Sequence, residues 1–281
     1  LALTRRIFRL NFRPKGRATH ELLSIQSFLC KIFKRTDHPA VIMEGVIATG
    51  CDFLDELLEG GYEPDVVTTV FGPSGSGKTS ICMCAAIARA AEKKVIYVDS
   101  EGGFSAARFR QLCRDPERVI QRMVFLKPAS FKEQEDVFER LPRLISDKIG
   151  LVIVDTISML YRLELGKEDD VKTVNRALGA QMGQLMKIAR KKMIPVIATT
   201  QVYSSFEEKN KVNLVGGDIV RYSSKCLIEL QVIDSYKRAI LKKHRSLPEK
   251  EIDFEIKQDG LYKREKTGER KGRSSGAIRL F

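Results

Sequence analysis

The sequence lacks a long apolar run. Within its 281 residues, no segment approaches the roughly 18 continuous apolar residues that a membrane-spanning helix needs. The first residues also lack the uninterrupted apolar stretch of a secretory signal. We therefore expect a soluble, intracellular protein without membrane contact.

Cysteine is present, but its distribution does not indicate a disulfide framework or a metal site. The six cysteines are scattered, and only Cys82 and Cys84 lie close together in the sequence. Two ligands one residue apart on a helix point about 200° away from each other, and no His/Cys pair lies nearby to complete a zinc site. We predict that the cysteines are reduced and pack in the core.

Positive charge is concentrated at the two ends of the chain. Residues 1–42 carry nine Lys and Arg against two acids, residues 263–281 carry seven against two, and the 220 residues between them are close to neutral. The C-terminal segment is short of apolar residues and predicts a solvated tail. Such a tail attracts phosphates without sequence preference if nucleic acid is a partner; the alternative is a solubilising tail without a partner.

The first 42 residues allow three interpretations. The chain opens with Leu1, and its first methionine, Met43, lies just before the apparent domain. We expect, in this order, an error in the assigned start, a basic DNA-binding arm, or a transit peptide. The predicted organisation is a basic extension over residues 1–42, one folded domain over 43–262 and a basic tail over 263–281.

The strongest motif is a phosphate-binding loop. Residues 72–80 fit the pattern G-x-x-x-x-G-K-[ST] and follow an apolar run, 66–71, that predicts a buried strand. The glycines let backbone N–H groups surround a phosphate, Lys78 reaches the β and γ phosphates of ATP, and the Thr79 hydroxyl holds Mg²⁺. The predicted nucleotide-binding residues are Gly72, Pro73, Ser74, Gly75, Ser76, Gly77, Lys78, Thr79 and Ser80.

Strand and helix patterns alternate along the rest of the chain, which indicates an α/β fold. We predict a mostly parallel, twisted sheet with helices on both faces, and an antiparallel C-terminal edge. No internal repeat is present. The expected strands are 66–71, 94–98, 123–126, 151–155, 195–200, 226–232, 239–243 and 252–256, and the expected helices are 78–91, 106–114, 131–146 and 169–192, with a polar stretch over 203–218.

Three polar side chains follow predicted strands at the edge where the phosphate-binding loop lies. Asp155 ends an apolar strand, as a Walker B aspartate does, and can orient a Mg²⁺-bound water. Glu101 can polarise the water that attacks the γ phosphate, or it caps the helix that follows. Gln201 can contact the γ phosphate, or it merely satisfies backbone groups at the end of its strand.

A second group of charges, Lys243-His244-Arg245, ends another predicted strand. These residues could reach the phosphates of a neighbouring subunit as a charge-neutralising finger. The alternative is that they only keep an edge strand from aggregating, which is the commoner use of charge there.

These motifs together resemble the RecA-like recombinase superfamily and, within it, the archaeal RadB group of RadA paralogues. The resemblance covers residues 45–262, nearly the whole chain after Met43, and rests on the order and spacing of several stretches. These are Thr49-Gly50 with residues 54–61, residues 97–104 with Arg108, residues 131–134, Ala189-Arg190-Lys191 before 194–197, Gln201-Val202, and Lys243-His244-Arg245 with Pro248-Glu249.

The resemblance implies roles for single residues. Lys78 and Thr79 hold phosphate and Mg²⁺, Asp155 is the Walker B acid, and Glu101 is the glutamate that activates water. Gln201 is a γ-phosphate switch that leads into a DNA-facing loop. Arg108 stacks on adenine, for which a planar guanidinium is suited; its alternative is an ordinary surface arginine.

The resemblance also implies a function. Such paralogues bind ATP, Mg²⁺ and DNA, hydrolyse ATP very weakly without stimulation by DNA, do not promote strand exchange and influence the processing of branched DNA in repair. The expected partners are single-stranded or branched DNA, bound largely without sequence preference, and the main recombinase or a Holliday-junction nuclease. A homo-oligomer and a cytoplasmic, nucleoid-associated location are further expectations.

Three departures from the superfamily pattern matter. Residues 1–42 are too short for the N-terminal helical DNA-binding module of full recombinases, which puts filament formation in doubt. The expected DNA-facing loop carries Glu207-Glu208 against Lys209 and Lys211, so it is not strongly basic. Asp65 stands where the family usually has a glycine. Two alternative functions therefore remain: an active DNA-dependent recombinase, and a KaiC-like signalling ATPase that uses Lys243-x-Arg245 across a ring.

Overall fold

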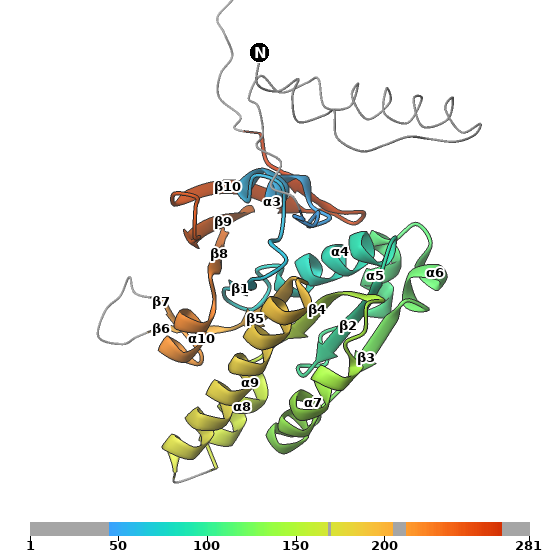
Figure 1. Cartoon of the computed structure of the whole chain (residues 1–281). Coiled ribbons are helices and arrows are strands. Elements are labelled where there is room, and N and C mark those ends of the chain that lie inside the picture. The colour runs from blue at the N-terminus through green and yellow to red at the C-terminus, as the bar shows by residue number, and fades with distance from the viewer. Residues whose placement is uncertain (1–44, 168–169, 205–211, 266–281) are drawn as a thin grey trace, which may run out of the picture. The chain divides into compact units, whose positions relative to one another are not determined.

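A computed structural model of the chain describes residues 45–167, 170–204 and 212–265. Its strands are β1 (Val67–Phe71), β2 (Lys94–Asp99), β3 (Met123–Leu126), β4 (Ile149–Asp155), β5 (Val196–Thr200), β6 (Val202–Ser204), β7 (Val212–Leu214), β8 (Cys226–Ile233), β9 (Tyr236–Lys243), β10 (Lys250–Ile256) and β11 (Leu261–Lys263). Nine of them form one sheet in the order β11-β10-β9-β8-β1-β5-β4-β2-β3 (Figure 1).

The sheet has a parallel and an antiparallel part. The six strands from β8 to β3 run parallel to one another, whereas β9, β10 and β11 add antiparallel pairs beyond β8. The helices are α3 (Asp52–Leu57), α4 (Lys78–Ala90), α5 (Ala106–Leu112), α6 (Pro116–Ile120), α7 (Phe131–Leu144), α8 (Met159–Leu165), α9 (Val171–Lys192) and α10 (Gly217–Ser223). The predicted fold class is confirmed.

Alternation along the central strands divides the hydrophobic core into two layers. In β4, Leu151 and Ile153 pack on the side of α3, α4 and α5, while Val152 and Val154 pack on the side of α7, α8 and α9. Successive strand residues point to opposite faces, so a strand covered by helices on both sides must be apolar throughout. Figure 1 shows α4 and α5 on one side of the sheet and α7, α8 and α9 on the other.

Local sequence explains where the two long helices begin and end. The Ser130 hydroxyl accepts from the Glu133 amide at 3.2 Å at the start of α7, and the Asp170 carboxylate accepts from the Lys172 amide at 3.0 Å at the start of α9. Both are N-cap bonds that satisfy otherwise unpaired helix amides. At the end of α9, Met193 adopts a left-handed conformation with φ 51°, which stops the helix before β5.

The structure adds elements that the sequence patterns did not predict. Helices α3, α6, α8 and α10 are all short, and the polar stretch expected over 203–218 contains part of an antiparallel ribbon, β6 with β7, in which Tyr203 pairs with Asn213. The two acidic residues expected in that stretch, Glu207 and Glu208, lie outside the described residues. Short elements of this kind carry too few apolar positions to show a period.

The described residues begin and end close to the two predicted boundaries of the domain. The whole basic extension over 1–42 lies outside the described residues, and so does the tail beyond Glu265. Strand β11 reaches Lys263, whose Nζ donates to Glu56 at 2.7 Å, so the folded part extends slightly past Tyr262. The five described cysteines are free and buried. No helix in the described ranges is long and apolar enough to cross a membrane.

Candidate nucleotide-binding site

The phosphate-binding loop follows β1 and leads directly into α4. Gly75 and Gly77 have φ values of 73° and 105°, in the left-handed region that favours glycine, and a Cβ added at Gly75 would meet no atom within 4 Å. A cavity of about 240 Å³ lies over the loop. It is lined by Ser74, Gly75, Gly77, Lys78, Thr79, Ser80, Glu101, Gln201 and Ile256.

Lys78 is held inside the loop by backbone carbonyl groups. Its Nζ donates to the Gly72 oxygen at 2.9 Å and to the Pro73 oxygen at 2.8 Å. Burial lowers the pKa of the Lys78 ammonium group, and the carboxylates of Glu101 and Asp155 act in the opposite direction. No described carboxylate forms an ion pair with Lys78, so its charge is left for an anion to neutralise.

Two further features of the loop fit a phosphate and a metal ion. The Ser76 hydroxyl is buried without a hydrogen-bond partner among the described residues, which costs free energy unless a ligand supplies one. Beside the loop, a Cβ added at Gly103 would lie 3.4 Å from the Thr79 Oγ1. Gly103 therefore lies directly beside the hydroxyl that is expected to hold Mg²⁺.

Asp155 lies at the end of β4 and is almost completely buried. Thr199 Oγ1 donates to its Oδ1 at 2.5 Å, and the Tyr97 hydroxyl donates to its Oδ2 at 3.0 Å. These bonds fix the carboxylate and leave further lone pairs on each oxygen. Asp155 does not line the cavity itself, which fits a carboxylate that would act on a metal ion through bound water.

Glu101 and Gln201 meet across the cavity although 100 residues separate them in the sequence. The Gln201 Nε2 donates to the Glu101 Oε1 at 2.8 Å, so this amide contacts a carboxylate and not the backbone. The alternative interpretation of Glu101 as a helix cap is wrong, because the Ser105 hydroxyl accepts from the Arg108 amide at the start of α5. Both residues line the cavity over the phosphate-binding loop.

Comparisons with known proteins agree with this geometry. The Rad51 family model matches residues 40–264. The DNA repair and recombination protein RadB of Methanobrevibacter smithii is 40% identical over 220 residues, which cover 74% of this chain and 92% of that protein. RadB of Methanocaldococcus jannaschii is 35% identical over 210 residues, covering 74% of this chain and 98% of that protein. This chain belongs to the Rad51 family, in its RadB group.

A solved structure supports the assignment at the level of the fold. The crystal structure of the RadB recombinase superposes with a TM-score of 0.67 at 34% identity, covering 78% of this chain and all of that chain. The family resemblance expected from the motifs is thus confirmed. The roles of single site residues stay predictions that depend on their positions in this fold.

Arg108, expected to stack on adenine, is not free in solvent but contacts the segment that connects β10 and β11. Its Nη1 donates to the Gln258 carbonyl at 2.7 Å and to the Gln111 Oε1 at 3.0 Å, and its Nη2 is buried with no described partner. Arg108 does not line the cavity over the phosphate-binding loop. Its contact with adenine remains a prediction, which requires the base to extend beyond that cavity.

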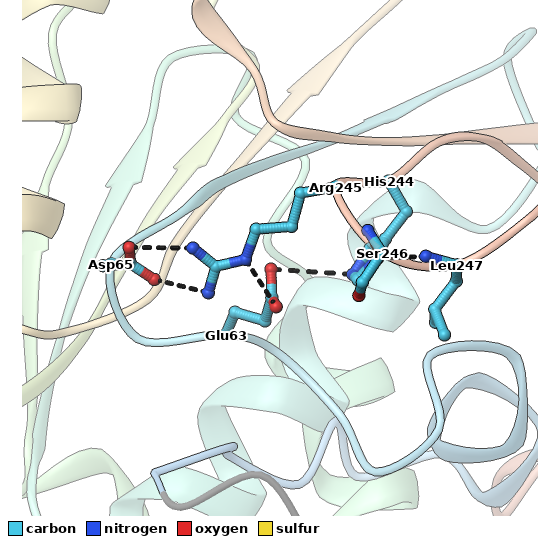
Figure 2. Close-up of polar contacts among 6 residues, drawn as sticks. All are labelled: Glu63, Asp65, His244, Arg245, Ser246 and Leu247. Atoms are coloured by element: carbon cyan, nitrogen blue, oxygen red, sulfur yellow. Dashed lines mark hydrogen bonds and ion pairs between the residues drawn. The ribbon is translucent and has the colours of Figure 1, made fainter.

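The charges at Lys243-His244-Arg245 have partners within this chain: Figure 2 shows those of His244 and Arg245, and the Lys243 Nζ donates to the Arg221 carbonyl at 2.9 Å. The Arg245 Nη1 and Nη2 donate to the two Asp65 oxygens at 3.0 and 2.9 Å, and its Nε donates to the Glu63 Oε1 at 2.8 Å. The His244 Nε2 lies 3.6 Å from the Glu63 Oε2. We call Glu63, Asp65, His244 and Arg245 the Arg245 clamp.

The Arg245 clamp ties the end of β9 to the loop before β1. The His244 Nδ1 accepts from the Leu247 amide at 3.2 Å, which requires a neutral ring with its proton on Nε2. Burial lowers the pKa of His244, against the effect of Glu63. Hydrogen bonds from Arg245 lower the pKa of Asp65. In this arrangement Arg245 is structural and does not extend toward a neighbouring subunit.

Sequence reasoning missed three residues of the site. Tyr97 and Thr199 fix Asp155 from the neighbouring strands β2 and β5, and Ile256 of β10 packs over the phosphate-binding loop, where a Cβ added at Gly77 would lie 2.8 Å from its Cδ1. Thr199 precedes Gln201 at the end of β5, so its polar side chain was a usable signal. Nothing in the local sequence distinguishes Ile256.

Proposed function

We propose that this protein is an ATP- and Mg²⁺-binding, DNA-binding recombinase paralogue that acts in DNA repair and homologous recombination. The observation that carries the proposal is the Gln201–Glu101 hydrogen bond of 2.8 Å in a cavity that also contains Lys78 and Thr79. It joins the predicted water-activating carboxylate to the residue from which the β6–β7 ribbon begins. The names of the RadB relatives support the assignment to repair and recombination.

Each site residue has a defined part in this proposal. The amides of the phosphate-binding loop and the Lys78 ammonium group would hold the ATP phosphates, and Arg108 would contact adenine. Thr79 and, through water, Asp155 would hold Mg²⁺, which supplies charge compensation when bound. Glu101 would orient and deprotonate the attacking water, and Gln201 would contact the γ phosphate.

We propose that turnover is very weak and is not stimulated by DNA. One oxygen of Glu101 accepts from Gln201, and a carboxylate that accepts a hydrogen bond is a weaker base than a free one. The proposal also includes the absence of strand exchange, an influence on the processing of branched DNA, and a location at the nucleoid in the cytoplasm. The main recombinase and a Holliday-junction nuclease are the proposed protein partners, and we include a homo-oligomer in the proposal.

The test is ATP turnover by the full chain, with and without single-stranded DNA, with Glu101→Gln as the blank for contaminating ATPase. Slow turnover that DNA does not stimulate supports the proposal. Strong stimulation by DNA would identify an active, DNA-dependent recombinase. A ring that assembles with ATP and without nucleic acid, detected by gel filtration, would identify a signalling ATPase, for which Arg245 would first have to leave Glu63 and Asp65.

A further inference from the structure

A second cavity, of about 560 Å³, lies at the amino ends of the parallel strands, where the chain enters β1, β2, β4 and β5. The phosphate-binding loop follows the opposite, carboxyl end of β1, and the two cavities share no lining residue. The volume falls within the range of small-molecule sites. We call this second, separate cavity the amino-end cavity.

Positive charge dominates the lining of the amino-end cavity. Arg89, Lys93 and Lys192 line it together with one acid, Asp147. Arg89 lies in the last turn of α4 and Lys192 in the last turn of α9, where helix dipoles favour cations. The dipoles explain why cations stand at these ends, but within the lining three cations still face a single carboxylate. The cavity therefore favours an anion.

The three cations have few opposite charges of their own. The Arg89 Nη1 donates to Glu92 at 2.6 Å, but this carboxylate is 74% exposed, which makes the pair weak, and the Arg89 Nε is buried without a described partner. The Lys93 Nζ donates to the Asp147 carbonyl at 3.1 Å. Lys192 has neither a hydrogen bond nor an ion pair within the described ranges. Both lysines can therefore neutralise a ligand.

A glycine fixes the position of two of these cations. A Cβ added at Gly150, the second residue of β4, would lie 2.7 Å from the Lys93 Cβ and would overlap the Arg89 Nε. The absence of a side chain at Gly150 thus lets the end of α4 lie directly against the start of β4. Because packing holds Arg89 and Lys93 there, a ligand would meet charges that are already in place.

The rest of the lining is largely apolar. Ile47, Pro64, Met193 and Ile194 contribute to it. Met193 is 59% exposed, and its flexible thioether side chain can adapt to the shape of a ligand. A free phosphate ion would leave these apolar walls uncovered. A molecule that carries both an anionic group and an apolar body would use the cations and the walls together.

We propose that the amino-end cavity binds a small organic phosphate. Arg89, Lys93 and Lys192 would hold the phosphate group, because a guanidinium matches its geometry and lysines supply point charges. The apolar walls would cover the organic body. Helix α4 has 13 residues, so this site lies about 20 Å along the helix from the phosphate-binding loop. It is a site beyond the ATP- and DNA-binding functions proposed above, and neither of them requires it.

The experiment follows the Met193 methyl group by NMR in the full chain labelled at its methionine methyls, with Met193→Leu to identify the signal. Phenyl phosphate, inorganic phosphate and phenol are titrated separately. Phenyl phosphate should shift the signal to saturation, at a concentration at least about fivefold lower than either of the others, because it alone uses both the cations and the apolar walls. Lys78→Ala, which alters the nucleotide site, should give the same titration.

Charge variants at exposed positions should change the affinity in opposite directions. Lys192→Gln should raise the Kd for phenyl phosphate by about two- to fivefold, as expected for one exposed charge contact, and Asp147→Asn should lower it by a similar factor. Lys191→Gln is the matched control, because it makes the same charge change at the adjacent exposed lysine of α9, which does not line the cavity. It should leave the Kd unchanged.

Four results would overturn the proposal. The Met193 signal does not respond to phenyl phosphate, or it no longer responds in Lys78→Ala. Inorganic phosphate or phenol binds as tightly as phenyl phosphate, so that the organic body or the phosphate group is irrelevant. Lys191→Gln and Lys192→Gln weaken binding equally, which would identify a general effect of net charge. Asp147→Asn weakens binding. Each of these results would leave the proposed ATP and DNA functions standing.

Discussion

Charged groups gather at both ends of the parallel strands, but they are satisfied differently. At the carboxyl ends, Lys78 bonds only to backbone carbonyls, and Glu101 accepts from an uncharged amide. At the amino end of β1, Arg245 is engaged by two carboxylates with three hydrogen bonds of 3.0 Å or less. Charges that the chain leaves without an opposite charge are those available to a ligand, whereas charges that it pairs hold the fold.

The largest expected effect is loss of nucleotide binding in Lys78→Ala. Removing the buried ammonium group leaves no charge to meet the phosphates, so we expect no detectable binding of a fluorescent ATP analogue. Because burial already disfavours the charged form, the free energy of unfolding should change by less than about 1 kcal/mol. Lys191→Ala, at an exposed lysine of α9, is the control.

The same variant also separates nucleotide binding from DNA binding. Most of the excess positive charge lies in residues 1–42 and 263–281 and not at the phosphate-binding loop, so Lys78→Ala should keep most of the DNA affinity at low salt. If a folded Lys78→Ala protein fails to bind DNA, this separation is wrong.

The next effect is on turnover. Glu101→Gln removes the predicted base and keeps the size of the side chain, so ATP hydrolysis should fall by about 10²–10⁴-fold while nucleotide affinity stays within about twofold. Glu117→Gln, at an exposed glutamate of α6, should leave turnover unchanged. Hydrolysis by Glu101→Gln at the wild-type rate would remove Glu101 from the mechanism.

In contrast, Arg245→Ala should reduce stability and not nucleotide binding. It leaves Glu63, whose side chain is 5% exposed, without its main partner, and we expect the free energy of unfolding in urea to fall by about 1–3 kcal/mol. Lys242→Ala breaks the more exposed Lys242–Glu249 pair of 2.6 Å and should cost less than about 1 kcal/mol. If Arg245→Ala instead abolished nucleotide binding with unchanged stability, the distinction between unpaired charges that bind a ligand and paired charges that hold the fold would be wrong.

The basic tail should contribute charge without sequence preference. A chain that ends at Glu265 keeps the contacts of Lys263 and Arg264 and loses five Lys and Arg against one Glu. DNA affinity should fall several-fold, and its dependence on salt should become flatter, because fewer counterions are released. An unchanged slope after truncation would show that the tail does not contact DNA.

The smallest expected effect is on the pH dependence of stability. Burial lowers the pKa of His244 below its ordinary value of 6.5. Below pH 6.5 the His244 side chain therefore binds a proton more readily in the unfolded chain than in the folded chain. Stability should therefore fall as pH decreases from about 6.5 through the folded-state pKa. His244→Gln should flatten urea midpoints measured across that range. If the urea midpoints of the wild-type protein and of His244→Gln changed with pH in parallel, His244 would not be the group that causes the loss of stability.

Local sequence was sufficient to predict the strands, the helix and the loop that have a characteristic local pattern. The apolar run 66–71 and the following G-x-x-x-x-G-K-[ST] pattern predicted β1, the phosphate-binding loop and α4 within one residue at each end. The run 151–155 predicted β4 with Asp155 at its end. A strand that is buried on both faces carries apolar residues at nearly every position, so its sequence is nearly diagnostic of a central strand in a parallel sheet.

Other parts of the site depended on contacts distant in sequence. The Thr199 and Tyr97 bonds to Asp155 follow from the strand order β5-β4-β2, which no local pattern contains. The Arg245 clamp pairs residues that lie 180 positions apart, and Asp65 was noticed only as an unusual residue before β1. Its bidentate contact with Arg245 now explains why an acid stands there.

The sequence by itself determined that this chain folds as a nucleotide-binding α/β domain of the Rad51 family, because hydrophobic period and loop chemistry are local properties. The tertiary structure decided which charges are paired. It brought Gln201 to Glu101 and gave Arg245 a structural role. Such outcomes depend on the register and order of strands far apart in the chain, which a single sequence does not fix.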